Sequence, residues 1–283
     1  MNTAPARSKE EILRAAGALP SLPKAVTGLM RTIEDENATS SMLAKQIEAD
    51  TGLLGSVLRL VNSPRYMARG GISTASQAVV VLGFDAIRNL VCVAGVSDYF
   101  RKSGAGAFDH ELFLRHSAGV GCAAKLLARH VGQDPDVAFA AGMLHDLGHL
   151  ALAAAAPHEF GMVLDYQKEK DCLFIEAERE VIGLDHTQIG AHLADMWNLP
   201  AEICEAIEYH HQVTGSCAVH SPIADLTHVA EVLAHAMELG SSDQVPPLSD
   251  TAMLRLGLSL AQVEQSLDEI EAEYNDYAHM LGV

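Results

Sequence analysis

Apolar residues recur along this chain with the spacing of helices, and this periodicity is what most constrains the fold. In the segment 51–61 the apolar side chains all fall on one face of a helix, as Leu53, Leu54, Val57, Leu58 and Val61. No stretch shows the sustained alternation of apolar and polar residues that is typical of a strand. Aromatic residues make up only 5% of the chain, which favours helix packing over a β-sandwich. We therefore predict an all-α protein.

Caps, prolines and glycines divide the chain into separate predicted helices. A Ser cap at Ser21 with an early proline begins one helix, and Asn62-Ser63-Pro64 ends another. The polar segment 240–249 is expected to be a loop. The expected helices cover 21–34, 38–49, 51–61, 75–82, 84–99, 109–131, 136–155, 158–169, 172–181, 186–196, 200–211, 221–239 and 259–281.

The segment 101–107, which contains Gly104 and Gly106, is the best candidate for a linker. We predict an N-terminal helical lobe of residues 1–105, packed on a C-terminal helical bundle of residues 106–283.

Charge and histidine content change at the same place. The net charge of −18 divides into +3 for residues 1–105 and −21 for residues 106–283, and all 14 histidines lie between His110 and His279. A field of this sign repels nucleic acid, so a nucleic-acid partner is not expected. Clustered carboxylates and imidazoles suit divalent cations, although a solvated acidic surface accounts for most of the excess carboxylates.

Cysteine usage and hydropathy predict a cytoplasmic protein. The five cysteines form no CxxC pair, as expected of free thiols in a reducing compartment. The first residues lack the apolar core of a signal peptide. The longest apolar stretch, 137–157, is interrupted by His145, Asp146 and His149, so we do not expect a membrane span or a membrane partner.

The segment Met143-Leu-His-Asp-Leu-Gly-His-Leu150 carries the clearest chemical signal. The two oxygens of an aspartate can bridge two ions, and the imidazole before it can bind one of them. His149 lies four residues after His145 and three after Asp146, so all three could share a helical face. A His-Asp pair taken alone is better explained as a helix cap or a surface pair.

Other histidines strengthen the interpretation of a metal site. His116, His186 and the pair His210-His211 each lie in an otherwise apolar predicted helix. A buried imidazole needs a partner, and a bundle that points such groups inward from several helices can build a metal site. Any one of these histidines could be an ordinary core residue, but the set predicts one or two divalent ions. Imidazole-rich ligands favour iron, manganese, nickel or zinc over calcium and magnesium.

The order H…HD…H…HH resembles the HD superfamily of metal-dependent phosphohydrolases. It is most similar to the bacterial HDOD signalling domains, which are related to the HD-GYP phosphodiesterases. The likeness covers about residues 15–240. The segments that resemble HDOD domains are Leu19-Pro-Ser-Leu-Pro23, Asp50-Thr-Gly-Leu-Leu54, Leu58-Arg-Leu-Val-Asn-Ser-Pro64, Ala78…Leu82-Gly83…Leu90-Val91 and Trp197-Asn-Leu-Pro200.

The resemblance implies a di-metal site. It assigns one ion to His116, His145 and Asp146, with Asp146 bridging to a second ion. The second ion would be held by His186, His210 and His211. The family usually closes the first site with an aspartate from a late helix, and Glu231 occupies that place here.

Two departures from the HD-GYP pattern bear on activity. His149 replaces the lysine of the HDxGK motif, and no GYP segment follows the double histidine. Cleavage of cyclic di-GMP is therefore disfavoured. The resemblance leaves two functions: a regulatory module that senses a small phosphorylated ligand or contacts a signalling protein, or a metal-dependent phosphohydrolase acting on a nucleotide or phosphodiester, with Asp146 and His149 as its catalytic residues.

Two further groups have open interpretations. His228, Glu231 and His235 are spaced so that they share a helical face, which is either an exposed polar stripe or part of the pocket. The residues Arg59, Asn62, Arg65 and Arg69 could bind an anion or a partner, or simply solvate a helix end.

Overall fold

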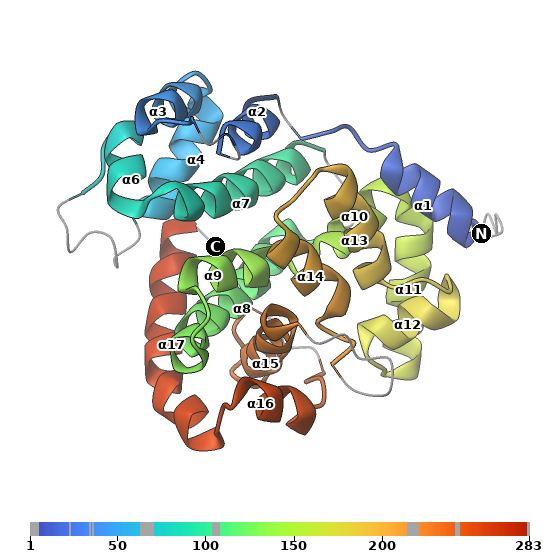
Figure 1. Ribbon diagram of the computed structural model, residues 1–283. Helices are drawn as coiled ribbons and strands as arrows, with labels where there is room; N and C mark the ends of the chain where they lie inside the picture. The colour runs from blue at the N-terminus through green and yellow to red at the C-terminus, as the bar shows by residue number, and fades with distance from the viewer. Residues whose placement is uncertain are drawn as a thin grey trace.

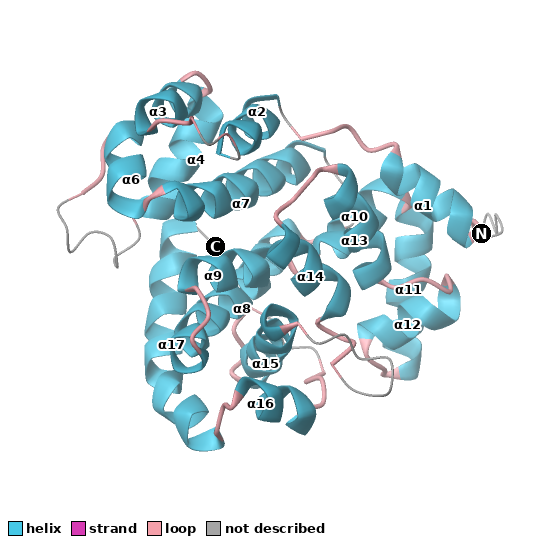
Figure 2. Cartoon of the chain, in the orientation of Figure 1, coloured by secondary structure: helices cyan, strands magenta, loops and turns pink. Residues whose placement is uncertain are grey.

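The chain folds into helices joined by loops, as the computed structural model in Figure 1 shows for residues 6–22, 24–33, 35, 37–62, 71–103, 108–213, 221–240 and 244–281. Figure 2 shows no strand among these described residues. The predicted all-α fold is therefore confirmed.

Helix α7 (Phe84–Ser103) is the centre of the N-terminal helices and connects them to the rest of the molecule (Figure 1). Thr39 and Thr74 cap the two helices that follow them by accepting backbone N–H groups. Helix α7 also contacts α9 (Pro135–Leu144) and α10 (Leu147–Ala155). The helices grouped with α7 are α2 (Lys24–Ile33), α3 (Ser40–Glu48), α4 (Thr51–Val61) and α6 (Ala75–Leu82).

Helix α8 (His110–Val131) forms the core of the C-terminal half. All its residues from His116 to Ala128 are buried. Asp109 caps its first turn, and Gly132 ends it at a φ of 70°, in the left-handed region that glycine adopts without strain. The helices that pack on it are α9, α15 (Pro222–Ala236) and α17 (Leu260–Leu281), the last preceded by α16 (Asp250–Leu256).

A second group of helices packs beside α8 and α9 and carries most of the candidate metal ligands. Helix α10 packs on α13, α13 on α14, and α14 on α15. The N-terminal helix α1 (Lys9–Gly17) packs on α10 and α13, and Arg7 just before it donates its backbone N–H to Glu159 at 2.9 Å. The remaining helices of this group are α11 (Pro157–Lys170), α12 (Phe174–Val181), α13 (His186–Met196) and α14 (Ala201–Tyr209).

The structure differs from the predicted helices in four places. The expected single helix 136–155 is two helices, because the chain turns at His145 and Asp146, where Asp146 has φ −93° and ψ 22°. The apolar periodicity continues through this turn, so the pattern alone could not show it. Helices α1 and α16 were not predicted. The expected linker is helical to Ser103, and its residues 104–107 lie outside the described part of the chain.

The stretch Pro135–Ala155 is long and apolar enough to span a membrane by length and composition, but 83% of its apolar 18-residue window is buried inside the protein. Burial of this extent is what the core helices of a globular protein show.

Gly148 lets α10 and α13 approach closely. A Cβ atom at position 148 would overlap the backbone carbonyl of His186, and one at Gly190 would lie 2.9 Å from the backbone nitrogen of Gly148. Because backbone atoms cannot move aside as a flexible side chain can, the contact between these two helices requires glycine at both positions. This contact places His186 beside the turn at Asp146.

We predict that Gly148→Ala lowers the free energy of unfolding by about 2 kcal/mol or more, because the added methyl group forces the two helices apart. Urea denaturation followed by circular dichroism measures the effect. Gly161→Ala is the matched control, since nothing lies within 4 Å of the added Cβ atom. In a helix interior, this control should raise stability by about 0.5–1 kcal/mol. Equal effects of the two substitutions would contradict the role given to Gly148.

Candidate metal centre

The Asp146 carboxylate lies at the turn between α9 and α10, and imidazoles face it from two sides. Its Oδ2 atom is 3.3 Å from His145 Nε2, 3.5 Å from His149 Nδ1 and 3.8 Å from His116 Nε2. The ligand atoms of His116, His145 and Asp146 all lie within 4.8 Å of one another. The structure thus brings together the three residues that sequence reasoning assigned to the first ion.

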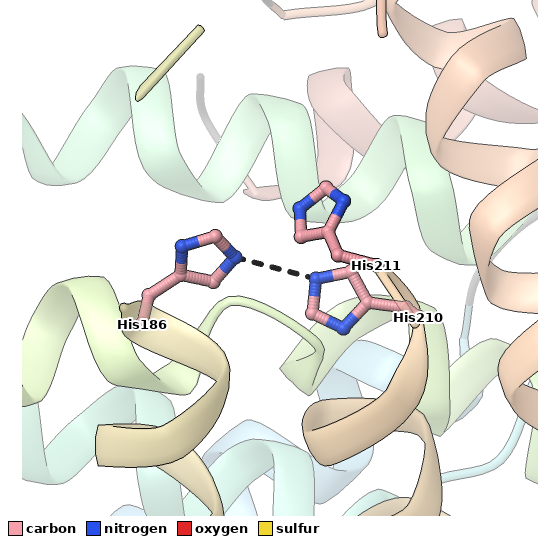
Figure 3. A group of neighbouring side chains, drawn as sticks. All are labelled: His186, His210 and His211. Atoms are coloured by element: carbon pink, nitrogen blue, oxygen red, sulfur yellow. Dashed lines mark hydrogen bonds between the residues drawn. The ribbon is translucent and has the colours of Figure 1, made fainter. Parts of the chain in front are cut away.

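The other oxygen of Asp146 faces a second group of histidines. Its Oδ1 atom is 3.4 Å from His186 Nε2 and 3.9 Å from His210 Nε2. Figure 3 shows His186 extending from the start of α13 toward His210 and His211, which follow the end of α14. These three rings form a second group of ligand atoms within 4.8 Å of one another. Asp146 therefore lies between the two predicted ligand sets.

Hydrogen bonds to backbone carbonyls fix the orientation of two of these rings. The Nδ1 atom of His145 donates to the carbonyl of Gly142 at 2.8 Å, and that of His210 donates to the carbonyl of Ala206 at 2.8 Å. Each proton on Nδ1 leaves the Nε2 lone pair directed at the centre of the site. A second group that holds the far nitrogen of the ring is typical of histidines that bind metals.

Glu178 performs this function for His186, and sequence reasoning missed it. Its Oε2 atom accepts from the backbone nitrogen of His186 at 2.9 Å and from its Nδ1 at 2.6 Å. Its Oε1 atom is 3.6 Å from His149 Nε2. The side chain is fully buried in α12, although carboxylates seldom are. Its place on the same face of α12 as Ile175 was the available signal.

Local capping explains why His186 lies where Glu178 can reach it. Asp185 caps α13 by accepting from the backbone nitrogen of Gln188, which makes His186 the first residue of the helix. The N–H at this position has no partner within its own helix, and the Glu178 carboxylate satisfies it. Arg179 holds the cap from outside by donating its Nε to Asp185 at 2.8 Å.

Glu231 of α15 lies where the two ligand groups meet. Its carboxylate lies within 4.8 Å of the ligand atoms of His145 and His210, and also of those of His211 and His228. Its Oε1 atom is 3.5 Å from His211 Nε2. His228 and Glu231 are each only 4% exposed, so α15 does not present them as an exposed polar stripe. His235 lies beside His116, with 4.6 Å between the ring centroids.

The possible anion site near the end of α4 lies only partly within the described residues. Asn62 binds the backbone of Ile72, donating from Nδ2 to its carbonyl at 2.6 Å and accepting from its nitrogen at 2.8 Å. Arg65, Arg69 and the side chain of Arg59 lie outside the described residues. An anion site at this helix end therefore stays a prediction.

Burial and neighbouring charges keep most of these imidazoles neutral. Burial lowers the pKa of His116 to about 3 and holds the pKa of His210 well below its ordinary value. Burial also acts to lower the pKa of His186, but the Glu178 carboxylate outweighs it and raises that pKa to about 9. Burial raises the pKa of Glu231 to about 7. Neutral imidazoles with a free lone pair are the form that binds metal ions.

The buried polar atoms at this site fit a divalent ion. Several of them have no hydrogen-bond partner among the described residues, and each would cost about 1–3 kcal/mol if left unsatisfied. An ion with nitrogen and oxygen ligands compensates that cost, and this donor set suits manganese, iron, nickel or zinc. The candidate ligand atoms among them are His145 Nε2, Asp146 Oδ1 and Glu231 Oε2.

We predict that Glu178→Ala weakens the binding of manganese about 10- to 100-fold, because His186 loses the group that orients its ring. Glu178→Gln should retain more of the affinity, since its amide oxygen can still accept from Nδ1. Isothermal titration of untagged protein measures both, and Glu180→Ala, two residues away on the exposed side of α12 and outside the cavity lining, serves as the control. Unchanged affinity in Glu178→Ala would contradict this role.

Comparison with known proteins agrees with the residue pattern. The HDOD domain family matches residues 19–213, which includes both histidine groups up to His211. Helices α15 to α17, and therefore Glu231, lie beyond the matched region.

Three similar proteins illustrate the range of relatives. An uncharacterised protein of Treponema pallidum (strain Nichols) is 24% identical over 251 residues, covering 88% of this chain but 47% of its own length, so the chain spans about half of that relative. An HDOD domain protein of unknown function from Geobacter sulfurreducens is 27% identical, with a TM-score of 0.76 over 95% of this chain and 98% of its own. A candidate phosphohydrolase from Shewanella amazonensis has the same fold, with 24% identity and a TM-score of 0.76 over 96% of this chain and 98% of its own.

Proposed function

The chain belongs to the HDOD domain family, and we propose that it is a regulatory module that binds a small phosphorylated molecule at a divalent-metal centre. One observation carries the proposal. The cluster around Asp146 borders a cavity of about 600 Å³, which is the size of a small-molecule site. His116, His149 and Glu231 line that cavity together with Asp146. A purely structural metal site is usually closed on all sides by protein ligands.

The two oxygens of Asp146 support an assignment of two ions. His116 and His145 would hold the first ion with Oδ2, and Glu231 lies close enough to His145 to complete this set. His186, His210 and His211 would hold the second ion with Oδ1. Divalent ions held there supply positive charge that attracts the oxygens of a phosphoryl group.

His149 supports a binding role over cleavage of cyclic di-GMP. Its ring lies between Asp146 and Glu178, at the place of the lysine in HDxGK motifs. Burial lowers the pKa of His149, so the ring is neutral and supplies no fixed cation for a second phosphate. A signalling protein that reads the state of this centre is the partner class that the family favours.

Hydrolysis of a phosphoester is the second candidate function. The arrangement that favours it is the position of Asp146, whose two oxygens each face a separate group of histidines at the cavity wall. Asp146 would position both groups relative to a bound phosphoryl oxygen. His149 also lines the cavity, and as a neutral imidazole it can accept a proton at a ring nitrogen.

We predict that untagged protein binds about two manganese or iron ions per chain, as an HD-type centre with a bridging carboxylate implies. With free metal 100-fold above its dissociation constant, the folded state should gain about 2.7 kcal/mol of stability, which raises Tm by several degrees. Asp146→Asn should remove this gain, because the amide cannot bridge two ions. Elemental analysis and thermal unfolding measure these effects, and metal-independent stability of the unmodified chain would exclude the proposed centre.

The two candidate functions predict different results with phosphorylated compounds. A regulatory module should bind inorganic phosphate only when metal is present and should leave nucleotides, cyclic dinucleotides and aryl phosphates intact. A phosphohydrolase should release phosphate or nucleotide from at least one of them, and Asp146→Asn should abolish that release. Phosphate release and chromatography of the products distinguish the two outcomes, with the metal content verified in each sample.

A further inference from the structure

Phenylalanine is concentrated around the cavity beside the metal centre. The chain has only seven phenylalanines, and four of them line this one cavity, on α8, α11 and α12 and just before α8. Such residues usually fill the core, as Phe139 does at 3% exposed and Phe160 at 6%, whereas Phe108, Phe113 and Phe174 are only half-buried. The four that line the cavity are Phe108, Phe113, Phe160 and Phe174.

These four rings form a continuous row that begins at the candidate metal centre. Phe174 packs on His149 with 4.6 Å between ring centroids and on Phe160 with 6.0 Å. Phe108 continues the row, 5.6 Å from Phe160 and 5.5 Å from Phe113. The contacts are tilted or edge-on, and Phe108, Phe113 and Phe174 are only half-buried, so part of their ring surface is left for a flat group to contact.

Aliphatic side chains extend this apolar wall. Leu112 is 46% exposed and Leu248 is 38% exposed, although both line the cavity. Leu164, Leu173 and Ile175 also contribute to the lining. Apolar surface of this kind favours a ligand that removes it from water, at about 25 cal/mol for each Å² buried.

The charges along the cavity limit the ligand to one anionic group. The described lining residues include four carboxylates but one guanidinium, that of Arg179. Its Nε donates to Asp185, and the side chain is 53% exposed. A second or third phosphate away from the metal centre would meet repulsion rather than compensation. The four carboxylates belong to Asp109, Asp146, Glu176 and Glu231.

We propose that this cavity binds a phosphomonoester whose organic part is a flat aromatic group, with the phosphoryl group at the metal centre and the ring along the phenylalanine row. The proposal rests on the proposed function, because the metal centre must take the phosphoryl group. It goes further by naming the chemical class of the ligand and the residues that recognise its organic part.

A matched pair of phosphonates that cannot be hydrolysed tests the proposal. Methylphosphonate and naphthylmethylphosphonate carry the same anionic group and differ in the aromatic ring. Both are titrated calorimetrically into manganese-loaded protein. The naphthyl compound should bind at least about tenfold more tightly, because its ring becomes buried against the phenylalanine row. A naphthalene with phosphonomethyl groups on opposite sides should bind more weakly than the compound with one phosphonate.

Variants separate the aromatic wall from the metal centre. Phe174→Ala and Phe113→Ala should each lower the affinity for the naphthyl compound about three- to tenfold. The affinity for methylphosphonate should stay unchanged. Phe174→Leu and Phe113→Leu preserve apolar packing and should lose less affinity, which guards against an effect of misfolding. Phe84→Ala is the control, since Phe84 is a half-buried phenylalanine at the start of α7 and does not line the cavity.

The possible failures are distinguishable. If both phosphonates bind with equal affinity, or if the cavity variants behave as Phe84→Ala does, the aromatic ligand class is wrong and the proposed function stands. Tighter binding of the naphthalene with two phosphonates would overturn the limit to one anionic group. If neither phosphonate binds to metal-loaded protein, the proposed function and the ligand class fall together.

Discussion

The burial of the Asp146 carboxylate is the constraint on which the rest of the structure depends. The residue is 5% exposed, and a buried charge of this kind is costly unless partners surround it. Those partners come from five places along the chain, so α8, α9, α10, α13 and α14 must converge on one point. The most apolar stretch of the sequence turns at this residue instead of continuing as one helix. Asp146 and the side chains around it therefore determine both the stability of the fold and the chemistry of the site.

The rings around Asp146 are held by two kinds of support, and these differ in how far along the chain they reach. His145 and His210 are oriented by carbonyls three and four residues earlier, so each is fixed as soon as its own helix end forms. His186 is oriented by Glu178, eight residues earlier and on another helix. One half of the site is therefore determined locally, whereas the other depends on how α12 packs against the start of α13.

Helix content and most helix positions could be predicted from the sequence, since α4, α6 and α13 begin and end at the expected residues. The histidines and Asp146 were identifiable because polar groups interrupt apolar helices. The turn at Asp146 was not, because apolar spacing continues on both sides of it. Glu178 and the phenylalanine row were missed because their roles arise from contacts between helices: Glu178 of α12 meets His186 at the start of α13, and the phenylalanines meet where α8, α11 and α12 pack together. The burial of Glu178 beside Ile175 could be read from the spacing in α12, but its partner could not.

The position of α1 has a consequence for how the chain can be divided. Ile12 and Ala16 are fully buried, and the helix packs on α10 and α13, although the chain goes on from it to α2 among the N-terminal helices. A fragment that starts at residue 106 would lack this helix and would expose the backs of the two helices that carry His149 and His186. The N-terminal segment thus joins the helices around α7 to the outer side of the histidine cluster, so the two halves of the sequence do not correspond to two separable packing units.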